Sequence, residues 1–540
     1  MKVSTQNDPR KTLFSGLRVV SFCTLLSRVL GMVRDVGMAM LFGNSVVMDA
    51  FSIAFRIPNL ARRLFGEGAL TAAFLPAFLR EKETQGIDSA WRLASAVLAV
   101  LAIVLAAGVI VTELFLWGLL QWGSSDTETV FLIKLIAIML PYLVLICLAA
   151  QVSAILHGLN HFTLPALLPI ILNIFWIAAI WLLAPQFASQ SMQAIVISAT
   201  IVGAGLLQFL APLPQLYSLG FRFDKKWRFA QQQMKEMTTA MLPVIVGLSV
   251  TQLNTLADSL IAWSFSRPEW ITEQTAASFF SRYPLEAGTA SALYFGQRLY
   301  QFPLGMIGVA LGTVLFPLLS RHAQQKNFDA FRDDLGLGLR LNFVIGIPAS
   351  LGLMILAEPI TRLLFQRGNF NQQDVLQTAT IIRAYASAVW AYCTLLLLHR
   401  GFYALEDRMT PLKIGLGGVA LNLFLNFTFI WHGGGAGLAW ATAFTAMVQT
   451  IVCTWFLVLE IGGLNWNEIS KTFLKSLLAT ILMGAACYAT LFFVTDSEIE
   501  FAPQLAQVFL PITVAIGVYL TAAKLLGLQE LGLLLQRKND

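Results

Sequence analysis

Arginine and acidic side chains are concentrated between residues 28 and 67 of this 540-residue chain, inside stretches that are otherwise apolar. A guanidinium group can bind a phosphate through two parallel hydrogen bonds, and it keeps its charge when it is partly desolvated. Several arginines that converge on one cavity would therefore suit a large anion with more than one charge, such as a diphosphate. We assign to this predicted cationic cavity Arg28, Arg34, Asp49, Arg56, Asn59, Arg63 and Glu67.

The spacing of these residues limits which of them can share a helix face. Arg28 and Arg34 are six residues apart, which on an α-helix is about 120° away from the same face. They can border one wide cavity, but they cannot stack in one stripe. Arg56 and Arg63 are seven residues apart, so they share a face, and Asn59 lies between them.

The same charges have a second interpretation, which the sequence leaves open. A charged side chain at bilayer depth costs at least about 2.5–3.5 kcal/mol on insertion scales, so it rarely faces lipid. The arginines could instead snorkel to the cytoplasmic ends of their helices, or pair with Asp35, Asp49 and Glu67. Arg298 would add a cation on the opposite side of the cavity, and its alternative is an interfacial arginine near the outer membrane surface.

A second set of polar residues lies in the second half of the chain. Asn254 and Asp258 share one helix face because they are four residues apart, and the same holds for Asn422 and Asn426. One carboxylate with amide and hydroxyl oxygens, including that of Thr442, suits a hard monovalent cation such as Na⁺. The alternative is that these groups only hydrogen-bond neighbouring helices to one another. Na⁺ is thus a candidate coupling ion, and no other metal or cofactor is expected.

The sequence contains no arrangement of residues that is typical of an enzyme active site. The five histidines are scattered toward helix ends without an HExxH motif, and no CxxC pair or Cys/His cluster occurs. The glycine-rich segment 433–437 lacks the Lys and Ser/Thr of a phosphate-binding loop, so we expect a tight turn between helices there. The sequence therefore favours a transporter, driven by an ion gradient, the membrane potential or the substrate gradient.

Helices in a membrane must position these residues. Hydrophobic residues make up 57% of the chain and charged residues 12%, which is about half the charge usual in soluble proteins. A spanning helix needs roughly 20 mostly apolar residues. Fourteen stretches qualify, although charges interrupt the first two: 18–43, 48–79, 93–120, 128–156, 163–185, 193–218, 238–265, 288–319, 336–357, 374–404, 411–431, 436–459, 473–495 and 503–526.

The distribution of Lys and Arg predicts how these helices are oriented. Short cytoplasmic loops carry an excess of both residues. Segments 1–17, 80–92, 222–235 and 321–332 are rich in them, and the alternate loops are poor, with exceptions near 267–282 and 362–367. This pattern predicts an even number of spans with both termini in the cytoplasm. The net charge of +6 then reflects topology and substrate charge, not a nucleic-acid partner.

An internal repeat divides the chain into two halves. Residues 69–80 read ALTAAFLPAFLR and residues 310–321 read ALGTVLFPLLSR, so Ala, Leu, Pro and Arg recur in register. An offset near 241 residues covers six helices, and an even number preserves orientation, so we expect parallel repeats. The prediction is an all-α polytopic membrane protein with two six-helix lobes around a central cavity. Its parts are a cytoplasmic lead (1–17), an N-lobe (18–235), a C-lobe (236–460), and two further helices with a cytoplasmic tail (461–540).

Several longer segments resemble the MurJ (MviN) family of lipid II flippases, within the superfamily of multidrug, oligosaccharidyl-lipid and polysaccharide exporters. The resemblance covers essentially the whole chain, and it is most specific between residues 27 and 76. The segments are SRVLGMVRD (27–35), MDAFSIAFRIPNLARRLFGEGALTAAFLP (48–76), HGLNHFTLPALLPIILNI (157–174), QRLYQFPLGMIGVALGTVLFPLLS (297–320), LLFQRGNFNQQD (363–374) and GFYALEDRMTP (401–411).

The resemblance implies that the chain flips lipid II, undecaprenyl-diphosphate disaccharide pentapeptide, across a bacterial cytoplasmic (inner) membrane by alternating access. Membrane lipid and proteins of cell-wall synthesis are the other expected partners. The chain departs from the family pattern at Gln297 and Asn426, where acidic residues often occur, and its loop at 266–287 is longer. Functional roles carry over to Arg28, Arg34, Asp49, Arg63, Glu67 and Arg298, and cation binding to Asp258, Asn422, Asn426 and Thr442.

Two other functions are compatible with parts of the sequence. An exporter of another polyprenyl-diphosphate-linked oligosaccharide, or of amphipathic drugs, would share the fold, but drug exporters favour acidic or aromatic cavities over cationic ones. A membrane transferase acting on a polyprenyl phosphate would need an acidic metal-binding motif such as DDxxD on a cytoplasmic loop, and the sequence has none. A flippase is therefore the leading hypothesis.

Overall fold

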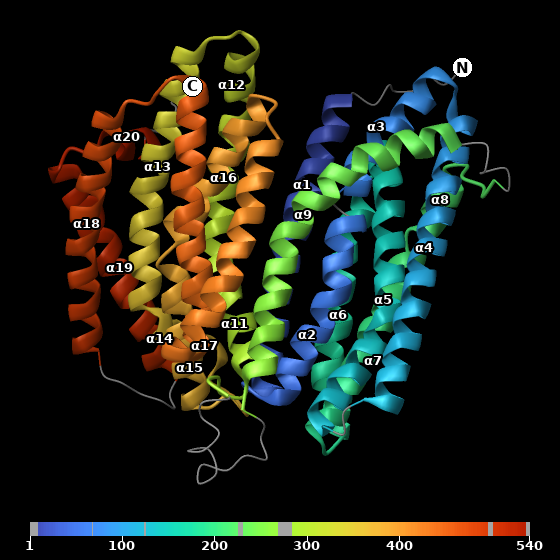
Figure 1. Cartoon of the computed structure of the whole chain (residues 1–540). Coiled ribbons are helices and arrows are strands. Elements are labelled where there is room, and N and C mark those ends of the chain that lie inside the picture. Colours follow the sequence, from blue (N-terminus) through green and yellow to red (C-terminus); the bar gives the residue numbers. More distant parts are fainter. Residues whose placement is uncertain are drawn as a thin grey trace. The chain divides into compact units, whose positions relative to one another are not determined.

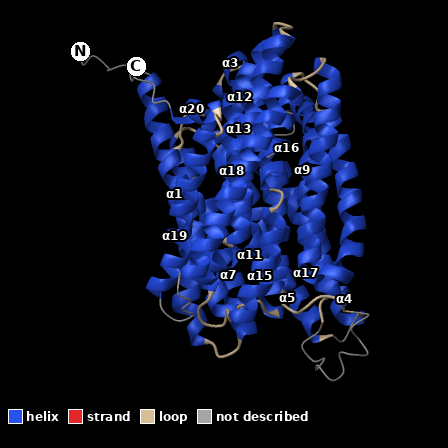
Figure 2. Cartoon of the chain, turned by 90° about the vertical axis from the view of Figure 1, so that its left-hand side faces the viewer, coloured by secondary structure: helices blue, strands red, loops and turns tan. Residues whose placement is uncertain are grey.

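The computed structural model of the chain describes residues 9–66, 69–123, 126–224, 231–267, 283–494 and 501–535. Helices account for nearly all of this described part, and its only β-structure is an isolated bridge between Ser266 and Leu285 (Figure 2). Because lipid cannot hydrogen-bond a peptide group, a chain this apolar satisfies its backbone within helices. The chain divides into two compact units, Met1–Leu256 and Ala257–Asp540.

The first unit is a bundle of long helices in which α5 packs against α2, α4 and α7 (Figure 1). Helix α9 begins in this unit and ends in the second. The elements are α1 (Pro9–Phe42), α2 (Val46–Ala61), the π-helix η1 (Arg62–Gly66), α3 (Ala69–Thr84), α4 (Ile87–Trp122), α5 (Thr127–Gly158), α6 (Thr163–Ala178), the π-helix η2 (Ala179–Leu183), the 3-10 helix η3 (Ala184–Gln186), α7 (Gln190–Leu210), α8 (Leu213–Ser218) and α9 (Gln231–Phe265).

The second unit is built in the same manner, with α13 packed against α12, α16 and α18, and α18 packed against α19 (Figure 1). Its last two long helices therefore attach to the unit mainly through the contact of α18 with α13, and α19 also contacts α14. The elements are α11 (Thr289–Pro303), the π-helix η5 (Leu304–Gly308), α12 (Val309–Gln324), α13 (Phe328–Ile355), α14 (Ala357–Phe365), α15 (Gln372–Ala386), α16 (Val389–Ala404), α17 (Met409–Ile461), α18 (Trp466–Phe493), α19 (Phe501–Leu525) and α20 (Gln529–Leu535).

Many of these helices are long and apolar enough to cross a membrane. Within the described residues nine qualify, or ten if the pair α15 and α16, bent by 43°, is counted as one span. This confirms the prediction of an all-helical, multi-span membrane protein. Helices α1, α2 and α9 are not among them, as expected for α1 and α2 from the charged residues in their sequences.

The glycine-rich segment 433–437 reverses the direction of α17. The Nδ2 of Asn422 donates a hydrogen bond of 3.2 Å to the Oγ1 of Thr442, although twenty residues of straight helix would extend about 30 Å. Gly434 has φ 53° and ψ −139°, and a Cβ at Gly437 would lie 2.4 Å from the carbonyl oxygen of Phe429. Helix α17 is therefore a hairpin of two helices, and the predicted tight turn is confirmed.

The start of α17 is held by the carboxylate of Asp407, which lies outside the apolar spans. Its Oδ1 accepts hydrogen bonds from the backbone N–H groups of Met409 at 2.9 Å and Thr410 at 3.0 Å. Burial raises the pKa of this carboxyl, but the hydrogen bonds from Thr410 and Met409 and the charge of Lys413 lower it by more. The pKa of Asp407 therefore lies below its ordinary value.

The two segments of the internal repeat share one helix irregularity. In the first unit α2 leads through the five-residue π-helix η1 to α3, and in the second α11 leads through the five-residue π-helix η5 to α12. The π-helices begin at Arg62 and Leu304, so their separation agrees with the offset near 241 residues in the sequence. A π-helix inserts a residue into the helical register, and such insertions are frequent at functional sites.

Candidate functional site

Arg34, on α1, lies in a buried polar cluster inside the first unit. Its Nε and Nη2 donate hydrogen bonds of 3.1 and 2.8 Å to the Oδ1 of Asp35, and its Nη1 donates one of 3.1 Å to the Oδ1 of Asn173 on α6. The guanidinium carbon stands 4.3 Å from the ring centre of Trp176. Arg34 and Asp35 are only 7% and 3% exposed. Arg34 is thus paired with Asp35 in this structure, as in the second interpretation of the sequence, in which the arginines pair with acidic residues.

Arg28 and Asp49 have opposite surroundings. Arg28 is exposed on α1, on a different face from the buried Arg34, as their six-residue spacing predicts. Asp49 is buried in the first turn of α2, next to Ser45, whose Oγ accepts a hydrogen bond from the N–H group of Met48. A carboxylate at this position is stabilised by the positive end of the helix dipole.

Arg56 and Arg63 both extend from α2 and η1 toward α9. The Nη1 of Arg56 donates a hydrogen bond of 3.1 Å to the carbonyl oxygen of Thr255, and the Nη1 of Arg63 donates one of 3.1 Å to the Oε1 of Gln252. Arg56 is half-buried and Arg63 is exposed. The two arginines reach neighbouring turns of one helix, in agreement with the shared face that their spacing predicts.

Asn59 accepts hydrogen bonds from Arg62, which was not among the predicted cavity residues. The Nε and Nη2 of Arg62 donate hydrogen bonds of 3.1 and 3.0 Å to the Oδ1 of Asn59. The π-helix η1 begins at Arg62, so this pair joins the end of α2 to the irregular turn. Glu67, the remaining member of the predicted cavity in this half, lies outside the described residues.

Arg298, on α11 of the second unit, is oriented by a tyrosine one turn before it. Its Nη2 donates a hydrogen bond of 3.0 Å to the Oη of Tyr294, and its guanidinium carbon lies 4.8 Å from the ring centre of the same residue. Tyr294 is buried, whereas Arg298 is half-buried. Arg298 and Arg56 each stand six residues before the π-helix of their own unit.

The predicted cation-binding residues come together in the second unit. The Nδ2 of Asn426 donates a hydrogen bond of 2.7 Å to the Oδ1 of Asp258 and one of 3.0 Å to the Oδ1 of Asn422. The Oγ1 of Thr442 accepts a hydrogen bond of 3.2 Å from the Nδ2 of Asn422 and donates one of 3.3 Å to the Oδ2 of Asp258, which closes a ring of hydrogen bonds. Asn254 lies one turn before Asp258 on α9 and is half-buried.

This ring is compatible with both interpretations that the sequence left open. It joins α9 to the two arms of the α17 hairpin, as interhelical hydrogen bonds would. It also contains the oxygens of the Asp258 carboxylate, the Asn422 amide and the Thr442 hydroxyl, although Asn426 presents its Nδ2 to Asp258, which is only 2% exposed. Oxygens of these kinds are the ligands that hard cations take in proteins.

Several partners of the site residues were missed by the sequence analysis. Asn173 is the single amide in the apolar run LLPIILNIFW, and a lone polar residue in a span is a signal that could have identified it. Trp176 and Tyr294 gave no such signal, because aromatic residues are common in apolar spans. Their roles follow only from the contacts with Arg34 and Arg298.

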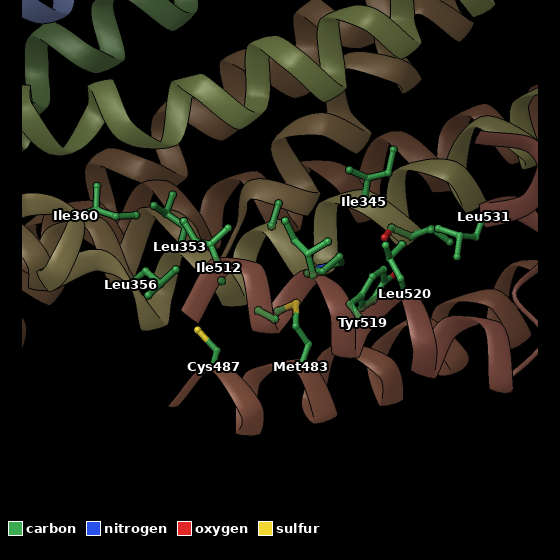
Figure 3. Close-up of a pocket in the computed structure, with 16 residues that line it drawn as sticks. Ile345, Leu353, Leu356, Ile360, Met483, Cys487, Ile512, Tyr519, Leu520 and Leu531 are labelled. Atoms are coloured by element: carbon green, nitrogen blue, oxygen red, sulfur yellow. The ribbon is translucent and has the colours of Figure 1, made fainter. Parts of the chain in front are cut away.

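An apolar cavity of about 390 Å³ lies within the second unit, between α13, α18 and α19 (Figure 3). Leu353, Met483, Ile512 and Tyr519 are among the side chains that line it. Its apolar lining suits a hydrocarbon chain and not a charged group.

The described residues contain no group of three or more His, Cys, Asp or Glu side chains placed to hold a metal ion. The five cysteines are buried thiols.

Comparison with protein families gives a match over most of the chain. The family model described as "Lipid II flippase MurJ" matches residues 38–515. A "Probable lipid II flippase MurJ" of Vibrio cholerae is 36% identical over 452 residues, which is 82% of either chain. The "Lipid II flippase MurJ" of Burkholderia cenocepacia is 32% identical over 449 residues, covering 82% of this chain and 83% of that one.

Solved structures give the same picture. A "Lipid II flippase MurJ, inward closed conformation" superposes with a TM-score of 0.74 at 26% identity, covering 94% of this chain and 98% of that one. An inward-facing multidrug transporter of the MATE family superposes with a TM-score of 0.63, covering 83% of this chain and 96% of that one, but at 13% identity. The second likeness shows a common fold and nothing more.

Proposed function

The chain belongs to the lipid II flippase MurJ family, and on that premise we propose that it flips lipid II from the inner to the outer leaflet of a bacterial cytoplasmic membrane. The observation that carries this proposal is the match of the family model to residues 38–515, together with relatives at 32–36% identity. The protein is a transporter, and the proposed cycle is alternating access.

The proposed topology has fourteen spans. Nine described helices qualify as spans by length and composition, and the α17 hairpin makes one of them two. The bent pair α15–α16 adds an eleventh span, and α1, α2 with α3, and α9 add three that are weakened by charge or length. We propose two parallel six-helix lobes around a central cavity, with α18 and α19 appended and both termini in the cytoplasm.

The arginines supply the proposed binding site for the diphosphate. Arg28 is exposed on α1, and Arg298 is held by Tyr294 with its guanidinium only half-buried, so both can bind an anion with little rearrangement. Arg34 is different, because it already donates hydrogen bonds to Asp35 and Asn173. In the proposed cycle Arg34 exchanges these partners for a phosphate when the substrate enters.

The isoprenoid tail needs an apolar environment throughout this cycle. We propose that it lies in lipid at a lateral gap between helices and that the apolar cavity between α13, α18 and α19 receives part of it. Membrane phospholipid is the competing occupant of that cavity.

Return of the empty carrier needs a source of energy. The membrane potential acts on a cationic cavity, at about 2.3 kcal/mol per charge for every 100 mV. We further propose that Na⁺ binds at Asp258 with oxygens of Asn422, Asn426 and Thr442, and with Asn254 one turn away. Its support is the cluster of oxygens around a buried carboxylate. For the Asn426 oxygen to become a ligand, its amide must turn away from the arrangement in which Nδ2 faces Asp258.

The test is complementation of cells depleted of their own lipid II flippase. We expect the wild-type chain to restore growth and Arg28→Ala, Arg34→Ala and Arg298→Ala to fail at matched membrane expression. Arg80→Ala is the control, because Arg80 is exposed at the end of α3. Failure of the wild-type chain despite correct insertion would point to another polyprenyl-diphosphate glycan as substrate. Full rescue by all three variants would contradict the cationic cavity.

A further inference from the structure

Three tyrosines of the second unit are in ring contact, and they come from α11, α15 and α16. The ring centre of Tyr300 on α11 is 4.8 Å from that of Tyr385 on α15 and 5.1 Å from that of Tyr392 on α16. Both pairs are tilted, with interplanar angles of 34° and 31°. Tyr300 therefore contacts both halves of the span that is bent between α15 and α16.

One end of this tyrosine cluster (Tyr300, Tyr385 and Tyr392) contacts the residue next to Arg298. The Nε2 of Gln297 donates a hydrogen bond of 3.3 Å to the Oη of Tyr385. Tyr385 is completely buried, so its position is determined by its neighbours. Movement of the Gln297–Arg298 segment must therefore displace Tyr385, or break this bond.

The other end of the cluster lies beside a helix of the proposed cation site. Tyr392 packs against an apolar group formed by Ala388, Ala391 and Ala443, and Ala443 directly follows Thr442, a member of the Asp258 ring. The hydroxyl of Tyr392 is buried and has no hydrogen-bond partner in the described part of the chain. A buried hydroxyl without a partner is unfavourable, so it responds to any charge or ligand that changes beside it.

The cluster also stands at two places where the helices are irregular. Tyr385 and Tyr392 lie on either side of the 43° bend between α15 and α16. Tyr300 lies four residues before the π-helix η5, in the same helix as Arg298. Irregular turns of this kind have alternative hydrogen-bonding patterns, which a coupled two-state movement requires.

We propose that the tyrosine cluster couples occupancy of the Asp258 site by a monovalent cation to the positioning of Arg298, and so to binding of a diphosphate head group. The inference rests on the proposed function and extends it, because it assigns the coupling to Tyr300, Tyr385, Tyr392 and Gln297. These residues act through Arg298 and Asp258 and are positioning residues. By linkage, the cation and the head group must alter each other's affinity by the same factor.

The experiment measures that factor on the purified full-length chain. Undecaprenyl diphosphate in nanodiscs serves as the probe, and its affinity is compared in NaCl and in choline chloride at equal ionic strength, so that screening is the same. For the wild-type chain we expect the two affinities to differ at least about fivefold. The Na⁺-dependent shift in melting temperature, measured without probe, shows separately that the cation binds.

Two variants interrupt the cluster at different points. Tyr385→Phe keeps the ring contact with Tyr300 and removes the acceptor of the Gln297 hydrogen bond, and Tyr300→Leu removes the ring contacts with both other tyrosines. We expect both to bind probe and cation, with the affinity ratio falling to within about twofold of one. The control is Tyr142→Phe, since Tyr142 is also a buried tyrosine but lies in the first unit, where its Oη donates a hydrogen bond to the Oε1 of Gln208. It should retain the wild-type ratio.

Each other outcome counts against the inference. A wild-type ratio preserved in Tyr385→Phe, or in Tyr300→Leu, would show that coupling does not pass through the cluster. A wild-type ratio of one, with probe binding intact, would overturn the coupling and leave the proposed function standing. No probe binding by the wild-type chain in either salt would contradict the proposed function itself, and the inference with it.

Discussion

Replacing Arg34 by methionine should destabilise the protein strongly, and restoring charge balance should reverse the loss. The Arg34 and Asp35 side chains are only 9% and 4% exposed, so their ion pair is screened little by solvent. Removing one member of a buried pair leaves the other as an isolated charge, which typically costs about 3–5 kcal/mol. We expect that loss in the unfolding free energy of Arg34→Met.

The double variant Arg34→Met/Asp35→Leu replaces both charges with apolar groups of similar size. Such replacements are often neutral or stabilising, so the double variant should recover to within about 1 kcal/mol of wild type. The assay is reversible denaturation in mixed detergent micelles, followed by tryptophan fluorescence, because Trp176 stacks on Arg34. A loss below about 1 kcal/mol in Arg34→Met would refute the reasoning, since it would show that the buried carboxylate does not depend on the guanidinium.

The same double variant separates two roles of Arg34. If the guanidinium exchanges Asp35 for a phosphate during transport, the double variant should be stable and still fail to restore growth in flippase-depleted cells. Rescue by the stable double variant would mean that Arg34 only holds α1 against α6.

Three further predictions concern other parts of the fold. Asp407→Ala should lower the melting temperature at neutral pH. Because the pKa of Asp407 is lowered in the folded protein, its contribution to stability is complete above the ordinary carboxyl pKa and is lost as the pH falls through the lowered value. The melting temperatures of wild type and variant should therefore converge in acid. Gly352→Trp should fill the apolar cavity and reduce the amount of co-purifying lipid measured by native mass spectrometry. Gly417→Trp, on an exposed part of α17, should not change it, and an unchanged amount of lipid in Gly352→Trp would contradict a lipid-filled cavity. Gly437→Ala should reduce the yield of folded protein on size-exclusion chromatography, because the added Cβ would collide with the backbone of Phe429. The control Gly433→Ala should behave as wild type, since a Cβ there has no atom within 4 Å, and equal yields of the two variants would argue against a close hairpin.

Much of the fold could be predicted because a membrane span leaves a simple pattern in the sequence. Long apolar runs located the spanning helices, and the glycines at 433–437 located the hairpin turn of α17. The π-helices η1 and η5 could not be found in this way, because a π-turn uses the same residue types as the α-helix around it.

The two candidate sites were predictable to different degrees. Asp258, Asn422, Asn426 and Thr442 are neighbours, as predicted, because few other polar groups occur in these apolar helices to pair with them, and four-residue spacing places Asn422 and Asn426 on one face. Arg34 was recognised as a buried charge, but the sequence could not show which neighbour holds it. Residue spacing describes one helix, whereas Asn173 comes from another helix 139 residues later.

The paired π-helices carry information about the history of the chain. Their sequences, RRLFG and LGMIG, share only the final glycine, yet both occupy five residues at the same place in the internal repeat. If the halves arose by duplication, the inserted residue was present before the copies diverged, and selection has since retained a backbone shape while replacing nearly every side chain in it. Deleting one residue from either segment would rotate everything downstream by about 100°. The length of these turns, more than their composition, is therefore what natural variation in such chains should preserve.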